Sequence, residues 1–219
     1  MSLRVKICGL TREVDVTAAV DAGADAVGFV LAPSPRRVSI DRAKKLALCV
    51  QPFVAVVAVV SDPPIELINE IVKCKVFDLV QFHGNEDPSL ISNCPLKSIK
   101  AIAVGSEEDL KLIPHYEDVA NFILLDSKRG KLKGGTGTTF DWQLIKNFNF
   151  KKPFILAGGI GPENVEQAVK FLNPRAIDAN SALEVSPGLK DETKIKKLMK
   201  KIKELNGFKT QTGGIEIGN

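Results

Sequence analysis

Reactive side chains stand directly after two apolar segments of this chain. Cys8 follows the segment Arg4–Ile7, and Asp126 follows the run 121–125. A thiol can act as a nucleophile or as a base, but a lone cysteine can also be a small buried apolar residue. Asp126 could cap a helix, but the Lys- and Gly-rich stretch after it carries no helical pattern. Catalysis is therefore one hypothesis for this pair, beside a structural role for each.

Three more polar side chains hold comparable positions. Gln81 and His83 end the apolar segment 78–82, and Asp178 ends the segment 175–177. His83 precedes a glycine and could anchor a turn, and the other two could be hydrogen-bonded rim residues. The sequence alone leaves both readings open.

Glycines and small polar residues follow the last two apolar segments. Gly158 and Gly159 come after 153–156, and Asn180 and Ser181 come after Asp178. Glycine allows the backbone to approach a ligand closely, and backbone N–H groups near a helix start can bind a dianion without lysine or arginine. Turns also use glycine freely, so the phosphate site predicted here depends on the fold.

The elements that must position these residues repeat along the chain. Eight strand–helix units in 219 residues average about 27 residues each, near the compact end of the range for a (β/α)8 TIM barrel, with eight parallel strands closed into a barrel. A doubly wound open sheet is the competitor, but a dinucleotide-binding one would carry GxGxxG after its first strand, and Cys8–Thr11 does not. The strand-like segments are 4–7, 24–30, 53–60, 78–82, 97–103, 121–125, 153–156 and 175–177.

The segments between the strands contain helix starts and one long loop. Asp62, Ser106 and Gly161 stand at positions typical of helix caps or first turns. Residues 127–139 are predicted as a Gly-rich loop after the sixth strand. Because such a barrel places its active site at the carboxyl ends of its strands, we expect the reactive side chains named above to meet there.

The chain's positive charge is local. The formal net charge is +4, and residues 190–209 alone hold eight lysines and three acidic residues. Apolar residues at helical spacing in this stretch predict a terminal amphipathic helix whose wet face carries the lysines, so no nucleic-acid partner is expected. These apolar residues are Ile195, Leu198, Met199, Ile202 and Leu205.

Composition and segment lengths suggest a single cytoplasmic domain. No linker divides the chain, so residues 1–205 are predicted as one barrel domain, and the polar, glycine-rich residues 206–219 as a flexible C-terminal tail. No apolar run reaches the ~18 residues of a membrane span and no signal peptide is recognisable. The four cysteines form no CxxC pair and the two histidines offer no zinc spacing, so reduced thiols and no metal site are expected.

Taken together, the chain resembles the phosphoribosylanthranilate isomerase family, (β/α)8 enzymes of tryptophan biosynthesis. The resemblance covers residues 3–205 and rests on several motifs in the family's order. These motifs are KICGLT (6–11), GADAVGFV (23–30), VQFHG (80–84), ILLDS (123–127), GGTGTTFDW (134–142), AGGIGPENV (157–165) and PGLKD (187–191).

The resemblance implies an Amadori rearrangement without a cofactor. N-(5-phosphoribosyl)anthranilate, a phosphorylated aminosugar, opens and isomerises to 1-(2-carboxyphenylamino)-1-deoxyribulose 5-phosphate. The family's general acid corresponds to Asp126, which would protonate the ring oxygen. Its general base corresponds to Cys8, which would remove the proton from sugar C2.

The resemblance also assigns the binding residues. Arg37 corresponds to the arginine that meets the anthranilate carboxylate, and Arg36 is its neighbour in the same loop. Asp178 corresponds to an aspartate at the substrate, and Gln81 and His83 belong to a strand motif with supporting roles.

The segment 178–184, DANSALE, departs from the family's usual DVSSGVE. Asn180 offers an amide in place of a hydroxyl, and Ala182 replaces a glycine and is expected to restrict the backbone at the phosphate. Thr138 stands where lysine is common and Ala157 where serine is common. We expect altered substrate affinity before lost chemistry.

Two other functions stay open from the sequence. A related barrel isomerase of the histidine pathway would act on another aminoaldose phosphate, but that family resembles this chain less because it has an aspartate where Cys8 stands. A phosphate-ligand-binding barrel without catalysis would bind and not turn over. The oligomeric state is also open, a homodimer included, because the helix faces that cover a barrel look the same as a dimer face.

Overall fold

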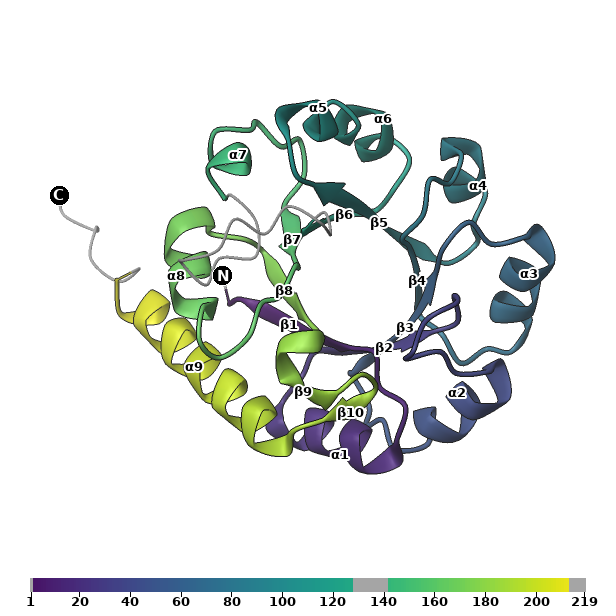
Figure 1. Ribbon diagram of the computed structural model, residues 1–219, viewed down its shortest axis with the longest axis horizontal. Helices are drawn as coiled ribbons and strands as arrows, with labels where there is room; N and C mark the ends of the chain where they lie inside the picture. The colour runs from purple at the N-terminus through teal and green to yellow at the C-terminus, as the bar shows by residue number, and fades with distance from the viewer. Residues whose placement is uncertain (1, 128–141, 213–219) are drawn as a thin grey trace, which may run out of the picture.

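Eight parallel strands close into a barrel, as the sequence predicts. A computed structural model describes residues 2–127 and 142–212, with side chains described to residue 207. Each strand is hydrogen-bonded to the next, and β8 returns to β1, so that Figure 1 shows a ring of strands inside a ring of helices. The strands are β1 (Arg4–Cys8), β2 (Ala26–Val30), β3 (Ala55–Val60), β4 (Leu79–Phe82), β5 (Lys97–Val104), β6 (Phe122–Ser127), β7 (Phe154–Leu156) and β8 (Ala176–Ala179).

The strands are apolar throughout because both of their faces are covered. In β3, Val57 and Val59 point into the barrel, while Val56, Ala58 and Val60 pack toward the helices. Successive side chains of a strand point to opposite faces, and a parallel sheet buries both of them. The (β/α)8 fold class is therefore confirmed, and the open sheet is excluded.

Helices follow the strands on the outside of the barrel (Figure 1). After β8 the chain forms a 3-10 turn, η1 (Ser181–Leu183), and a small antiparallel pair, β9 (Glu184–Ser186) and β10 (Leu189–Lys190). The helices are α1 (Glu13–Ala22), α2 (Ile40–Ala47), α3 (Ile65–Lys73), α4 (Pro88–Ser92), α5 (Glu107–Leu110), α6 (Ile113–Glu117), α7 (Gln143–Lys146), α8 (Val165–Leu172) and α9 (Glu192–Thr212).

The helix starts agree only in part with the capping pattern. Ser106 is the N-cap of α5, as predicted. The prediction for Asp62 is wrong, because α3 starts after Pro64 and Asp62 instead accepts a hydrogen bond from the Asn85 N–H with a backbone φ of +46°. Asn164 rather than Gly161 is the N-cap of α8. A tertiary contact with the loop after β4 thus replaces the local cap at Asp62.

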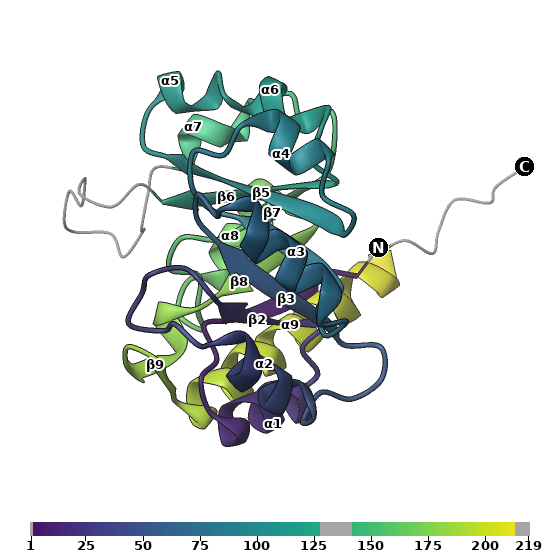
Figure 2. The same ribbon diagram turned by 90° about the vertical axis from the view of Figure 1, so that its right-hand side faces the viewer.

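The terminal amphipathic helix is confirmed, and it is longer than expected. Four of its apolar residues are buried, Ile195, Leu198, Met199 and Ile202, and α9 packs beside α1 and α8 (Figure 2). The helix continues to Thr212, past residue 205, where a tail was expected to begin. Residues 213–219 of that segment lie outside the described residues, as do residues 128–139 of the predicted Gly-rich loop, Thr138 among them.

Two further observations concern membrane-spanning helices and the cysteines. Within residues 2–127 and 142–212, no helix is long and apolar enough to cross a membrane. All four cysteines are free thiols.

Candidate active site

A cavity of about 400 Å³ lies at the carboxyl ends of the strands. Its walls come from the ends of β1, β4, β6 and β8 and from the loops after β2, β7 and β8. Nine residues that the sequence predicts for the site line it. They are Cys8, Gln81, His83, Asp126, Gly158, Gly159, Asp178, Asn180 and Ser181.

On one side of the cavity, Cys8 stands above a buried ion pair. Lys6 and Cys8 are two residues apart in β1, so both point into the barrel, and Lys6 is the direct neighbour of Asp178 in β8. The Lys6 Nζ lies 2.9 Å from Asp178 Oδ2, with side chains that are 5% and 7% exposed. A lysine and an aspartate therefore sit inside the barrel, below the thiol.

Burial and charge act in opposite directions on this thiol. Burial raises the pKa of Cys8 above its usual range, and the ammonium of Lys6 works against that rise. Burial also acts to lower the pKa of Lys6, but the charges of Asp178 and Cys8 outweigh burial and raise it. Lys6 is thus a buried cation.

On the other side, Asp126 and His83 face each other. Asp126 Oδ2 lies 3.2 Å from His83 Nε2, and Asp126 Oδ1 accepts a hydrogen bond of 2.7 Å from the Ser127 N–H. His83 Nδ1 lies 3.4 Å from Gln81 Nε2. The side chains of His83 and Asp126 are 35% and 26% exposed, so this pair can exchange protons with water while Cys8 cannot do so as easily.

A second buried ion pair holds the loop that carries His83. Lys100 of β5 points away from the barrel interior, and its Nζ lies 2.5 Å from Glu86 Oε2 and 2.6 Å from the carbonyl oxygen of Gly84. Glu86 Oε1 accepts from the N–H groups of Gly84 and Asp62. Lys100 and Glu86 are almost completely buried, with side chains 2% and 0% exposed. The segment next to His83 is fixed from behind by charge-assisted hydrogen bonds.

Backbone amides after β7 and β8 form the candidate phosphate site. Gly158 and Gly159 have φ values of +83° and +76°, which favour glycine, and a Cβ on Gly158 would lie 2.7 Å from the Ser127 nitrogen. Ser181 starts the 3-10 turn η1. A side chain at Gly158 would therefore collide with the backbone at the end of β6.

Ala182 does not disturb this backbone in the way expected from the sequence. Ala182 lies inside η1, and its backbone φ is not positive. Its methyl group packs against Gly161, where an added Cβ would lie 2.6 Å from it. The alanine is therefore accommodated by the glycine opposite, not by a shift in its own φ.

Asn180 belongs to a charged cluster that the sequence does not reveal. Its Oδ1 accepts a hydrogen bond of 2.8 Å from Lys190 Nζ, which also lies 3.0 Å from Glu184 Oε1. Arg36 binds both oxygens of Glu184, at 2.7 and 2.6 Å. Glu184 and Lys190 stand in two of the family-like motifs, but only the folded chain shows that they anchor Asn180 and Arg36 beside the cavity.

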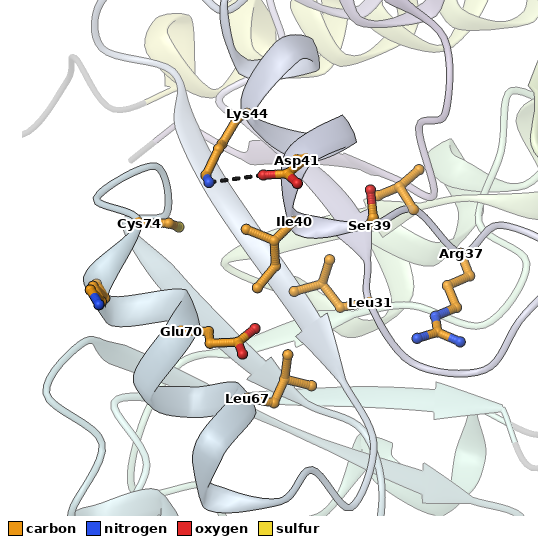
Figure 3. A pocket seen from close by; sticks show the side chains of 11 residues that line it. Leu31, Arg37, Ser39, Ile40, Asp41, Lys44, Leu67, Glu70 and Cys74 are labelled. Atoms are coloured by element: carbon orange, nitrogen blue, oxygen red, sulfur yellow. Dashed lines mark hydrogen bonds and ion pairs between the residues drawn. The ribbon is translucent and has the colours of Figure 1, made fainter.

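Arg37 is the one predicted site residue that the structure does not bring to the cavity. Arg36 lines the cavity, whereas Arg37 is exposed and lines a separate groove between α2 and α3. In Figure 3 the Arg37 guanidinium lies apart from the other labelled side chains of that groove. Arg36 stands in a turn closed by a hydrogen bond from the Arg37 N–H to the Ser34 carbonyl oxygen, and Arg37 forms a bridge with Val30. The two neighbouring arginines therefore line different hollows.

The described residues offer no metal site. Among them, no group of three His, Cys, Asp or Glu side chains is placed to hold an ion. The polar groups around the cavity include a thiol, two carboxyl groups, one imidazole, one guanidinium, side-chain amides, hydroxyl groups and backbone amides. Such a set can transfer protons and bind an anion.

Comparisons with known proteins identify the family. Residues 5–201 match the family model described as N-(5'phosphoribosyl)anthranilate (PRA) isomerase. An N-(5'-phosphoribosyl)anthranilate isomerase of Petrotoga mobilis is 46% identical over 203 residues, which is 93% of this chain and 98% of the relative.

Solved structures agree with the sequence comparison. The crystal structure of the Thermotoga maritima phosphoribosyl anthranilate isomerase superposes with a TM-score of 0.85 at 37% identity and covers 92% of this chain and 99% of its own. Another, in complex with reduced 1-(o-carboxyphenylamino)-1-deoxyribulose 5-phosphate, has a TM-score of 0.80 at 35% identity, with the same coverage of both chains. The isomerase that the sequence resembles is confirmed. The chain belongs to the N-(5'-phosphoribosyl)anthranilate isomerase family.

Proposed function

We propose that this protein catalyses the Amadori rearrangement of N-(5'-phosphoribosyl)anthranilate in tryptophan biosynthesis, with Asp126 as general acid and Cys8 as general base. The observation that carries these roles is that both side chains line the same cavity, from opposite parts of the barrel. A substrate ribose between them would meet an acid on one side and a base on the other.

Asp126 opens the ring in the first step. Protonation of the furanose oxygen breaks its bond to C1, and the anthranilate nitrogen supplies the electron pair that forms the Schiff base. His83 supports this step, since its Nε2 lies 3.2 Å from Asp126 Oδ2 and a proton shared between them can pass to the substrate. The partial exposure of the pair lets water restore that proton.

Cys8 removes the C2 proton in the second step. The C–H bond breaks, an S–H bond forms, and the electron pair moves through C1 to the nitrogen, which gives an enolamine. Tautomerisation of the enolamine yields the ketone. The protonated Schiff base acidifies the C–H bond, so a thiolate is a sufficient base.

Unpaired polar atoms and backbone amides would hold the sugar phosphate. Asp178 Oδ1 and Gln81 Oε1 are buried and have no hydrogen-bond partner, and buried acceptors normally have one. Substrate hydroxyl groups can provide these hydrogen bonds. The amides of Gly158, Gly159, Asn180 and Ser181 would receive the phosphate.

Arg37 remains our proposed ligand for the anthranilate carboxylate. Its guanidinium is exposed, so it can turn toward a substrate at the mouth of the cavity. Arg36 is the alternative, but both of its hydrogen bonds to Glu184 are made inside the protein. A guanidinium already engaged in a bidentate pair offers fewer donors to a second carboxylate.

Compartment and assembly are also proposals. We place the protein in the cytoplasm, where its four free thiols would stay reduced.

We propose a homodimer, because Leu48 and Phe53, between α2 and β3, are 86% and 105% exposed. Large apolar side chains exposed in one short connection are candidates for an interface, and sedimentation of wild type against Phe53→Ser tests this.

A fluorescence assay tests the activity. The substrate is generated freshly before each measurement, and its conversion changes the anthranilate emission. We expect turnover without added metal or cofactor. Binding without turnover would instead support the ligand-binding barrel, and turnover of the histidine-pathway aminoaldose alone would support the related isomerase.

A further inference from the structure

We propose that Lys6 is a positioning residue for Cys8, whose ammonium, held inside the barrel by Asp178, stabilises the thiolate that removes the C2 proton. This inference rests on the proposed function, since it takes Cys8 as the base. Lys6 does not line the cavity, so it acts through Cys8 and not on the substrate.

The geometry places the ammonium directly beside the thiol. The Lys6 Nζ is fixed by its 2.9 Å contact with Asp178. Lys6 Nζ and Cys8 Sγ both border the point where a Cβ on Gly28 would stand, at 3.1 and 2.8 Å from it. Both side chains project into the barrel from the same strand, one layer apart. With Asp178 fixing one end of the arrangement, the ammonium cannot turn away from the thiol without losing its ion pair.

Gly28 of β2 provides the space for this contact. It stands opposite Cys8 in the strand ladder, and a Cβ built there would lie 2.8 Å from Cys8 Sγ and 3.1 Å from Lys6 Nζ. Any larger residue would push the ammonium or the thiol aside. The absence of a side chain at Gly28 is thus explained by the Lys6–Cys8 pair and not by a turn, because Gly28 lies within a regular strand.

The charges that face Cys8 come from four elements. Lys6 of β1 and Lys190 of β10 favour the thiolate, while burial and Asp178 of β8 oppose it. Arg36, in the loop after β2, also interacts with the thiolate charge. The Lys6 charge acts on Cys8 more strongly than the Asp178 charge. Removing Lys6 should therefore raise the pKa of Cys8, and removing Asp178 should lower it.

A purely structural role for Lys6 makes a different prediction. If Lys6 only neutralised Asp178, replacing both residues together would leave the thiol unchanged. Removal of one partner of a buried pair would still destabilise the fold, so stability or activity alone cannot separate the two roles. The ionisation of Cys8 in the free enzyme can.

The experiment measures alkylation of Cys8 by iodoacetamide against pH. It uses the full chain with Cys49→Ser, Cys74→Ser and Cys94→Ser, so that the remaining thiol is the one in the cavity. Lys6→Met, Asp178→Asn and the double variant are compared in this background, and circular dichroism confirms that each is folded.

We expect Lys6→Met to slow alkylation at pH 8 by about tenfold or more, since an opposite charge within a few ångströms shifts a pKa by about one unit or more. Asp178→Asn should speed it several-fold, and the double variant should react more slowly than the parent and faster than Lys6→Met. If Lys6→Met does not fold, the other two variants decide. Unchanged midpoints in Asp178→Asn and the double variant, or a downward shift in Lys6→Met, overturn the proposal.

This readout is independent of the proposed function. Alkylation is measured without substrate, so it reports the Lys6–Cys8 interaction whether or not Cys8 is the base. Loss of turnover in the parent enzyme's Cys8→Ala variant addresses the base itself. Shifted alkylation with full turnover of Cys8→Ala would therefore reject Cys8 as the general base and keep the electrostatic contact.

Discussion

The two sides of the cavity use buried charge in different places. On the β1–β8 side, the ion pair of Lys6 and Asp178 is inside the barrel, next to the reactive thiol. On the β4–β6 side, the ion pair of Lys100 and Glu86 is behind the strands and touches only the loop that carries His83. One pair acts on a reactive atom and the other on the backbone that positions a reactive residue.

The difference follows from access to water. The Cys8 thiol is buried, so water cannot stabilise a thiolate there and a counter-charge has to come from the protein. Asp126 and His83 are partly exposed, and water is available to solvate and reprotonate them. We infer that a barrel needs charge within its interior only on the side where a buried group must ionise.

The largest effects are expected from the two side chains that we propose as general base and general acid. Cys8→Ala and Asp126→Asn should each lower kcat by about 10²-fold or more, the usual loss for a general acid or base. The control Cys74→Ala removes a thiol in the groove between α2 and α3 and should leave kcat unchanged. Near-native kcat in either site variant would remove that residue from the mechanism.

The second prediction concerns stability on the β4–β6 side. Lys100→Met should lower the free energy of unfolding by about 3–5 kcal/mol, because it leaves the Glu86 carboxylate buried without a partner. The matched control is Lys111→Met, whose pair with Glu108 is 72% and 76% exposed and should contribute less than about 1 kcal/mol. Urea unfolding measures both. Equal losses in the two variants would show that burial of the Lys100 pair is not what stabilises this loop.

The residues at the strand ends could be predicted because the fold itself brings them together. Cys8, Asp126 and Asp178 each follow a recognisable apolar segment, and closure of a parallel barrel places all such ends at one mouth. Gly158 and Gly159 could be predicted for the site because they follow the seventh strand. No long-range pairing had to be known for any of these residues.

The ion pairs could not be predicted in the same way. Lys6 and Lys100 are lysines within strands, and their partners depend on which face each points to and on the register with a neighbouring element. The positions of Arg36 at the cavity and Arg37 in the groove between α2 and α3 depend on the turn that holds Arg36, which the sequence does not show. Asp62 was misassigned because a hydrogen bond to Asn85 replaced the cap.

The third prediction concerns how the stability that Lys100 and Glu86 give to the loop after β4 depends on pH. Burial acts to raise the pKa of Glu86, but the hydrogen bond and charge of Lys100 outweigh burial and lower it. A depressed pKa in the folded state stabilises the protein above the pH at which an unfolded glutamate titrates, about 4.3, and this stabilisation is lost as pH falls through the lower folded value.

Glu86→Gln should therefore be less stable than wild type near neutral pH, and the difference in unfolding free energy should narrow below about pH 4.3. Denaturant unfolding at a series of pH values measures this. Asp118→Asn, at an exposed ion pair with Lys151, provides the matched control and should show a small difference at every pH. A constant gap between Glu86→Gln and wild type would mean that the Glu86 charge does not contribute.

The smallest expected effect concerns substrate binding at the mouth of the cavity, away from both ion pairs. Arg37→Ala should raise KM by about tenfold with little change in kcat, because a hydrogen bond to a charged group contributes about 1.5–3 kcal/mol and the carboxylate takes no part in the proton transfers. Steady-state kinetics of Arg37→Ala and Arg37→Lys measure the split.

Arg36→Ala separates the two arginines. It removes the bidentate partner of Glu184, which also pairs with Lys190 beside Asn180. The change should therefore disturb the phosphate end of the site, and inorganic phosphate should then inhibit less well. Inhibition of Arg37→Ala by phosphate should stay as in wild type, since Arg37 lies outside the cavity. If KM is unchanged in Arg37→Ala and rises only in Arg36→Ala with phosphate inhibition intact, Arg36 is the carboxylate ligand, and its pair with Glu184 must open when substrate binds.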